Sequence, residues 1–413
     1  MLSNGTIAIW SVPRQGCAGT LVEAHFNYWR LAGGKSIKQR GTGWRKKVAD
    51  DFLEIGLLFE DVSQIDAIRI FLPTLVKRSM IGDCAPLLAL PKFAQGIFNE
   101  VLSTTSNAAG APSCVILNNQ NGGIFCRVHR FAASSGVIDT SELEIDPQND
   151  GTLLTIPRGA IDVCANVLPL EQSYFRLRIR LSGSAKLNPF IKVIPPLDRH
   201  LQSGHEEIEY IDFRMNEART LPQPIENLMR ADRMNGGPNA QPIDFKLVAF
   251  LTAVPVHSEL SASSAPSHKM RLLEKDWDDY VDLDLPLGMA VYHWKRERER
   301  EIVPGTVVGA PPVFIPITDF SAFVKLLTRR SSWKIVLVYL ALAFAIGLLG
   351  NATASWIGIG DSPARVEAKL TIRTDAARAA PEPVQLSPPA APQGDRAATP
   401  PSGATGDKVG NTL

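Results

Sequence analysis

A run of uncharged residues near the end of the chain constrains its folding more than any other feature. Residues 335–359 are 25 consecutive positions without Asp, Glu, Lys or Arg, and most of them are apolar or glycine. As a helix this run would be roughly 37 Å long, whereas the hydrocarbon core of a membrane needs about 20 residues to cross about 30 Å. Trp333 and Trp356 lie near its two ends, where indole rings favour the membrane interface. The sequence predicts one transmembrane helix at 335–359.

The flanks of this helix predict its orientation. The 15 residues before it carry four basic side chains and the 15 after it carry three, a small bias toward a cytoplasmic N-terminal side. The N-terminus shows no basic stretch followed by a long apolar one, so no secretory signal is visible. We expect a single-pass protein of the inner (plasma) membrane, with its N-terminal region cytoplasmic and its C-terminal tail outside. The tail, 360–413, is rich in proline and alanine, and we expect it to be mostly disordered.

Small residues recur at a spacing of four within the predicted helix. Ala343 and Gly347 form one such pair, and Gly350 begins another. This spacing lets two helices approach closely, so the face predicts packing against a second helix. Alanine and glycine are common in membrane helices in any case, and simple anchoring is the alternative.

The five cysteines indicate the redox environment. Their number is odd and no two of them form a CxxC pair, unlike the denser pattern of a secreted disulfide scaffold. We expect free thiols in a reducing compartment, where a cysteine is most simply a small buried apolar residue.

Between residues 1 and 302 the pattern is mainly β. Short apolar or alternating runs are separated by Gly, Pro and Asn turns, and the runs 114–117 and 124–131 flank an Asn-Gly-Gly hairpin signal. We expect β-sandwich or barrel-like modules with a few helices, arranged as two cytoplasmic modules, 1–150 and 151–302. The further predicted elements are strands at 52–60, 67–72, 174–181, 208–215, 245–254 and 288–294, and helices after Pro91 and at 224–234.

Residues 303–334 are expected to join the β modules to the membrane. The first part, 304–316, is rich in proline and glycine and predicts a semi-rigid spacer. The second part, 318–330, has Phe320, Phe323 and Leu327 at helical spacing, with basic residues near its end. It predicts either an amphipathic helix at the interface or the first turns of the transmembrane helix.

Two groups of basic residues could bind an anionic ligand. Residues 30–47 hold no acidic residue, and they include a Gly-Gly-Lys-Ser sequence that resembles a phosphate-binding loop. Trp29 stands where such a loop requires a glycine, which excludes that motif. A solvated loop, or pairing with acids on a neighbouring strand, is the alternative interpretation. The predicted ligand-binding residues are Lys35, Lys38, Arg40, Arg45, Lys46 and Lys47, and, on one face of the strand 174–181, Arg176, Arg178 and Arg180.

One cluster of residues predicts a metal site. His200, His205 and Glu206 lie close together in a segment that reads as a loop because of its proline and glycine. The spacing does not match the helical HExxH pattern of zinc proteases. A second acidic run, 276–284, lacks the glycine and closing glutamate of a calcium loop and predicts a strand with a solvated acidic face.

The sequence holds no recognisable catalytic motif and indicates no cofactor. The formal net charge of +1 gives no general attraction to nucleic acid, which is not an expected partner. The expected partners are the lipid bilayer, a protein partner or a second copy of the chain, and an anionic ligand. We therefore expect a membrane-anchored binding or effector protein, of which a bacterial stress or phage-defence effector is one example. The alternatives are a membrane-tethered hydrolase or nucleotide-processing enzyme, and an assembly scaffold with a periplasmic proline-rich tail.

Overall fold

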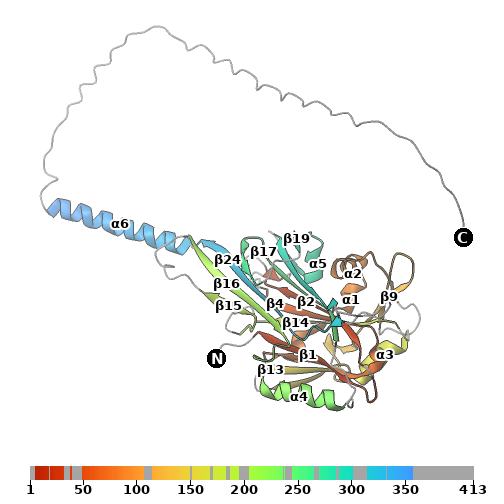
Figure 1. Ribbon diagram of the computed structural model, residues 1–413. Helices are drawn as coiled ribbons and strands as arrows, with labels where there is room; N and C mark the ends of the chain where they lie inside the picture. Colours follow the sequence, from red (N-terminus) through yellow and green to blue (C-terminus); the bar gives the residue numbers. More distant parts are fainter. Residues whose placement is uncertain are drawn as a thin grey trace, which may run out of the picture. The chain divides into compact units, whose positions relative to one another are not determined.

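Most strands of the chain belong to two large sheets (Figure 1). The computed structural model describes residues 5–17, 19–31, 38–39, 49–106, 114–148, 151–167, 171–182, 187–194, 204–235, 237, 244–264, 269–284, 288–300, 314–331 and 333–356. The strands of the first sheet are, in spatial order, β12 (Glu144–Gln148), β13 (Gly151–Pro157), β5 (Ile65–Leu72), β1 (Thr6–Pro13), β16 (Gly204–Met215), β24 (Phe320–Ser331) and β18 (Ser258–Ser263), with β15 (Ile191–Ile194) paired to β16.

The second large sheet contains ten strands. Its centre is formed by β2, β4 and β14, which run antiparallel to one another, and β17 lies parallel to β2. The strands are, in spatial order, β19 (Lys269–Leu272), β21 (Met289–Glu297), β17 (Asp244–Pro255), β2 (Leu21–Trp29), β4 (Asp51–Phe59), β14 (Ser173–Leu181), β9 (Ile124–His129), β8 (Cys114–Asn118) and β7 (Ser103–Ser106), with β6 (Ile81–Asp83) paired to β14.

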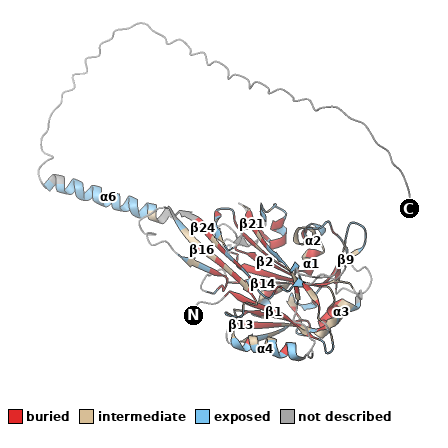
Figure 2. Cartoon of the chain, in the orientation of Figure 1, coloured by how far each residue is buried: buried red, intermediate tan, exposed pale blue. Residues whose placement is uncertain are grey.

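One apolar core joins the inner faces of these two sheets. Phe213 of β16 stacks on Phe250 of β17 with ring centroids 4.4 Å apart, and Phe26 of β2 lies 4.9 Å from Phe213. Buried residues of both sheets belong to the same cluster, and Figure 2 shows their strands largely in red. Two antiparallel-rich sheets packed over a shared core form a β-sandwich. The prediction of a mainly β fold is therefore confirmed.

Short helices cover the outer faces of the sheets. Ile225 of α4 (Gln223–Asn235) packs against Trp10, Phe71 and Leu153 of the eight-stranded sheet. On the ten-stranded sheet, Phe93 of α2 (Pro91–Phe98) joins a cluster with residues of α5 (Trp277–Val281), β2 and β4. The helices outside the apolar segment are α1 (Ala85–Leu88), α2 (Pro91–Phe98), α3 (Arg158–Val167), α4 (Gln223–Asn235) and α5 (Trp277–Val281). The short elements are η1 (Val62–Gln64), η2 (Arg78–Met80), β3 (Lys38–Gln39), β10 (Ala133–Ser134), β11 (Val137–Ile138), β20 (Leu283–Asp284), β22 (Glu299–Arg300) and β23 (Phe314–Ile315).

The local signals that the sequence gives most clearly are confirmed. Strands β8 and β9 form the predicted hairpin, in which the Asn119 side chain accepts a hydrogen bond from the Gly123 amide at 2.9 Å. Gly122 takes a positive φ of 77°, which explains the need for glycine there. Helix α2 begins at Pro91 and α4 spans the second predicted helix. The six other predicted strands correspond to β4, β5, β14, β16, β17 and β21.

The division into modules 1–150 and 151–302 does not follow the sheets. Strand β13 pairs with β5, β14 with β4, and β17 with β2, so the two halves of the chain alternate within both sheets. Residues up to Ala345 belong to one compact unit. The predicted boundary near residue 150 falls between β12 and β13, which pair with each other in the eight-stranded sheet.

The predicted helix at 318–330 is wrong, because this segment forms β24. The strand pairs with β16 over twelve residues on one side and with β18 on the other. Phe320, Ala322, Val324 and Leu326 are buried at every second position, whereas Phe323 is more than one-third exposed. Pairing on both edges fixes an extended backbone here and overrides the helical spacing of the apolar residues.

The acidic run 276–284 also differs from its prediction. Trp277 to Val281 form helix α5, and only Leu283–Asp284 are extended, as β20. Trp277, Tyr280 and Val281 share one apolar face that packs on the ten-stranded sheet. Burial of two aromatic rings decides the local conformation, and the acidic residues occupy the remaining positions.

Helix α6 (Trp333–Trp356) covers most of the predicted membrane segment. Residues Ile335–Thr353 are long and apolar enough to cross a membrane, and none of this stretch is buried in the protein. Figure 2 shows the helix pale blue, as exposed side chains. Ala343, Gly347 and Gly350 are exposed on it, so their predicted packing remains a prediction. Residues 357–359, and the tail predicted to be disordered at 360–413, lie outside the described residues, as do 304–313 of the predicted spacer.

Candidate functional site

The predicted basic loop falls mostly outside the described residues. This holds for Lys35, Arg40, Arg45, Lys46 and Lys47. Lys38 lies in β3, whose backbone pairs with β20 opposite Asp284, and its side chain is not described.

Arg30, at the start of the same basic stretch, is not available to a ligand. It is buried and donates to Asp51 at 2.9 Å and to both carboxylate oxygens of Glu209 at 2.9 and 3.1 Å. Glu209 belongs to β16 and Asp51 to β4, so this arginine joins the two large sheets.

The predicted row of three arginines on β14 is not a free basic face. Arg176 is fully buried and donates to Glu54 at 2.6 Å, and the half-buried Arg178 donates to the same carboxylate at 2.8 Å. Only Arg180 is exposed. Glu54 stands opposite Arg178 on β4, so the alternative interpretation, pairing with an acid on the neighbouring strand, holds for Arg176 and Arg178.

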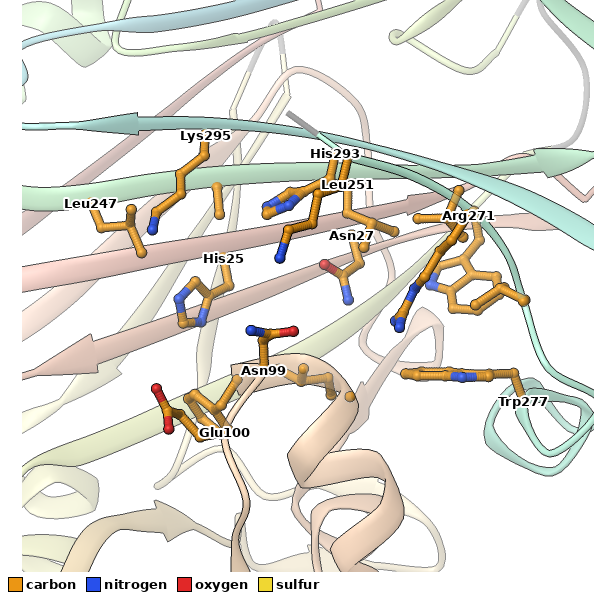
Figure 3. A pocket seen from close by; sticks show the side chains of 18 residues that line it. His25, Asn27, Asn99, Glu100, Leu247, Leu251, Arg271, Trp277, His293 and Lys295 are labelled. Atoms are coloured by element: carbon orange, nitrogen blue, oxygen red, sulfur yellow. The ribbon is translucent and has the colours of Figure 1, made fainter. Parts of the chain in front are cut away.

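A pocket of about 280 Å³ opens on the outer face of the ten-stranded sheet, next to this ion network (Figure 3). Neighbouring strands β2, β17, β21 and β19 supply one wall, and α2, α5 and the residues after α2 supply the other. Asn99 ends α2 in the left-handed conformation, with φ of 55°, and this turn brings Asn99 and Glu100 to the rim. Its volume is near the lower end of the range for small-ligand pockets, about 300–1,000 Å³.

Strand register explains why polar residues meet in this pocket. His25 of β2 lies opposite Ala249 of β17, which lies opposite Lys295 of β21. Two residues further along these strands, Asn27 and His293 both lie opposite Leu251 of β17. Residues that face each other across paired strands share one face of a sheet. The same rule places Lys269 beside His293.

The floor of the pocket rests on buried polar groups. His25 Nδ1 lies 3.4 Å from the Tyr174 hydroxyl, which accepts a hydrogen bond from Arg176 Nη1 at 2.8 Å. The Asn27 amide is oriented so that its nitrogen donates to the Phe26 carbonyl and its oxygen accepts a hydrogen bond from Arg176 Nη2 at 2.6 Å. Gly56 makes this arrangement possible, because a Cβ at its position would overlap the Tyr174 hydroxyl.

Glu54 is the centre of the buried network. It accepts hydrogen bonds from Arg176 and Arg178, and from the Tyr280 hydroxyl at 2.8 Å. Burial opposes the charge on Glu54, but the two arginines outweigh burial and keep the pKa of Glu54 below its usual value. Two guanidiniums against one carboxylate leave an excess positive charge directly beneath the pocket.

The electrostatic environment of the pocket is positive. Lys269, Arg271 and Lys295 line it, against the single carboxylate of Glu100. Burial, together with the nearby charges of Arg176, His293 and Lys295, lowers the pKa of His25 to about 3. His25 is therefore neutral at physiological pH and can accept or donate a hydrogen bond.

Aromatic rings line both walls of the pocket. Trp277 of α5 packs 5.0 Å from Tyr280, and Trp29 of β2 stacks on Phe52 with centroids 5.5 Å apart. Trp29 Nε1 is buried without a hydrogen-bond partner among the described residues. The pocket therefore combines hydrogen-bond donors and cations with a flat aromatic wall.

The predicted metal site is only partly described. His200 lies outside the described residues, and the side chain of His205 is not described. Both His205 and Glu206 belong to β16, which corrects the loop prediction, and Glu206 is exposed. In the described part of the chain, another group of side chains has the geometry to hold a metal: Cys114, His129 and Cys164, all buried.

Glu142 positions the histidine of this second group. His129 Nε2 lies 2.8 Å from Glu142. Burial opposes a charge on His129, but the Cys164 thiol and Glu142 outweigh it and raise the pKa of His129 to about 9. The neighbouring Cys114 thiol and His129 lower the pKa of Cys164 to about 5 against the effect of burial.

Neither a protein-family model nor a curated protein sequence matches this chain.

Sequence reasoning missed the pocket residues. Strand 21–29 alternates Val22, Ala24 and Phe26 with His25 and Asn27, which is the pattern of a strand with one polar face. In the same way, His293 and Lys295 alternate with buried aromatic residues in β21. These alternations were a usable signal for the face of each residue, but the strand order that brings them together was not in the sequence pattern.

Proposed function

We propose that this protein is a membrane-anchored receptor whose β-sandwich binds a small anion with a flat ring, such as a nucleoside phosphate. The observation that carries the proposal is the group of cations Lys269, Arg271 and Lys295 around a cavity with an aromatic wall. Phosphate oxygens accept charge-assisted hydrogen bonds from such cations. A planar ring gains contact area and dispersion energy against Trp277.

Arg271 is the residue best suited to hold the anion. Lys295 is engaged by Glu297 on the same strand, whereas Arg271 forms no ion pair with a described residue. The guanidinium presents several donors in one plane, which matches the geometry of a phosphate group.

Binding measurements on the detergent-solubilised full chain test this proposal. The probes are adenosine and guanosine monophosphates, cyclic mononucleotides and inorganic phosphate, titrated by calorimetry. Loss of a charge-assisted hydrogen bond costs about 1.5–3 kcal/mol, so Arg271→Ala should weaken binding about 10- to 100-fold. Arg296→Ala is the matched control, because Arg296 is an exposed arginine on β21 that pairs with Asp319 away from the pocket.

The outcomes separate the ligand classes. Binding of nucleotides but not of inorganic phosphate supports a ring against Trp277, and binding of phosphate alone restricts the site to the anion. If no probe binds, or if both arginine variants lose the same affinity, the pocket is not the ligand-binding site.

The proposal includes anchoring in the inner membrane through α6, with the sandwich in the cytoplasm. The apolar length of Ile335–Thr353 supports a membrane span, and the larger number of basic residues before the helix supports this orientation. Protease digestion of intact spheroplasts tests it: the sandwich should be protected until the membrane is permeabilised. Digestion of the sandwich before permeabilisation would indicate the opposite orientation, with the sandwich outside.

The effector version of the proposal assigns α6 a role beyond anchoring. Replacing α6 with an unrelated apolar helix should then abolish the response to ligand while membrane attachment is kept. An unchanged response would leave anchoring as its only role. The hydrolase alternative depends on His200, His205 and Glu206, and the scaffold alternative depends on the tail, so both remain predictions.

A further inference from the structure

A buried group of thiols and an imidazole lies at one end of the ten-stranded sheet, outside the pocket. Cys114 is the first residue of β8, His129 the last residue of β9, and Cys164 lies in α3. The ligand atoms of the three residues all lie within 4.8 Å of one another. We propose that Cys114, His129 and Cys164 bind a thiophilic divalent cation, with Zn²⁺ as the best fit.

The donor set favours this metal. Two thiolates and one imidazole are typical ligands of Zn²⁺, at distances of about 2.3 Å for sulfur and about 2.0–2.1 Å for nitrogen. In a tetrahedral site such ligands are separated by about 3.5–3.8 Å. Atoms within 4.8 Å of one another therefore need to close by only about 1 Å, which is within the range of side-chain rotation. Two thiolates also neutralise the charge of the cation, which a buried site requires.

The surroundings of His129 resemble those of a metal-bound histidine. Its Nε2 contacts the Glu142 carboxylate at 2.8 Å, an arrangement that fixes the ring and is common behind zinc-bound histidines. The other nitrogen, Nδ1, is buried without a hydrogen-bond partner among the described residues. A buried polar atom without a partner destabilises the folded chain, and a bound cation would satisfy it.

The site would join segments that the sheets alone do not connect. Cys114 and His129 stand opposite each other at the open end of the β8–β9 hairpin, and Cys164 lies on the helix between β13 and β14. A metal at this point would tie α3 to the hairpin. Three protein ligands leave a fourth position for water or another small ligand.

Elemental analysis of the full chain, purified in detergent without chelators, tests the proposal. We expect about one zinc ion per chain, and a chain produced in cobalt-supplemented medium should show the thiolate-to-Co²⁺ charge-transfer absorption in the near ultraviolet. The variants Cys164→Ser and His129→Ala should lose at least 80% of the metal. Cys126→Ser is the matched control, because Cys126 is equally buried on β9 but packs with the cluster on the outer face.

A measurement on the unaltered chain covers variants that fail to fold. Chelation should lower the thermal unfolding midpoint of the unaltered chain and of Cys126→Ser alike. Substoichiometric metal in the unaltered chain, with no cobalt absorption after reduction, would falsify the proposal. A Cys114–Cys164 disulfide that persists in the freshly isolated protein would also overturn it, because oxidised sulfurs cannot bind the cation.

Discussion

At the scale of single residues, one buried carboxylate holds the polar interior of the ten-stranded sheet together. Glu54 is fully buried and compensates two guanidiniums, of which Arg176 is also fully buried. Both arginines and the strand that carries them were visible in the sequence. Their partner was not, because it is set by the register that places Glu54 opposite Arg178, 124 residues away.

Because Glu54 neutralises two arginines, removing its charge should lower the free energy of unfolding. Glu54→Gln removes the negative charge with little change of shape and leaves the fully buried Arg176 and the half-buried Arg178 without it. Breaking a buried ion pair costs about 3–5 kcal/mol, so the free energy of unfolding should fall by about 3 kcal/mol or more. Denaturant unfolding of the full chain in detergent, followed by Trp fluorescence, measures the change.

A surface pair provides the comparison for this prediction. Asp279 lies 3.6 Å from Lys92, with both side chains substantially exposed. Exposed ion pairs contribute about 0–1 kcal/mol, so Asp279→Asn should have a small effect. Similar losses in the two variants would mean that burial of Glu54 adds nothing to its interaction with the arginines.

At the scale of elements, strands with one polar face could be predicted from the sequence. Segments whose conformation is set by tertiary contacts could not. The apolar residues at 320–327 fit both a helical and a strand spacing. Backbone pairing with β16 and β18 makes this segment the strand β24. Helix α5 was missed for the converse reason, since Trp277 and Tyr280 pack on a sheet whose strands come from distant parts of the chain. The pocket could not be predicted as a site because four strands in the order β19–β21–β17–β2 supply its polar wall.

A glycine in α2 gives a prediction at the same scale. In an exposed helix position, Gly→Ala stabilises by about 1 kcal/mol. At Gly96, however, a Cβ would lie 2.6 Å from the Trp277 ring. Overpacking costs about 1–3 kcal/mol, so Gly96→Ala should destabilise the chain by about 1 kcal/mol and weaken ligand binding by displacing Trp277.

The helix α3 offers the matched control. Gly159 is exposed in α3, and a Cβ at its position meets no atom within 4 Å. Gly159→Ala should therefore be neutral or stabilising by up to about 1 kcal/mol. Thermal unfolding of both variants checks the contrast. A stabilised Gly96→Ala chain with unchanged binding would show that Trp277 is free to move.

At the scale of the whole molecule, the chain combines a β-sandwich that buries its apolar residues with a helix that exposes them. Val338, Leu342, Phe344 and Leu349 are each more than half exposed on α6, and the helix has no polar face. A helix of this length with apolar residues exposed on all sides is long and apolar enough to cross a membrane, which supports the proposed anchoring. This feature needed only local sequence, which is why it could be predicted without any knowledge of the fold.

Charges placed in the middle of α6 test this interpretation. An arginine near the centre of a membrane helix costs about 2.5–3.5 kcal/mol, so Leu342→Arg combined with Ile346→Arg should shift the chain from the carbonate-resistant membrane fraction to the soluble or aggregated fraction. Leu75→Arg with Leu187→Arg is the matched control, because both leucines are 68% exposed on the sandwich and the added charge is the same. That control should remain in the membrane fraction. If the α6 variant also remains there, or if the unaltered chain is soluble without detergent, the helix does not anchor the protein by crossing the bilayer.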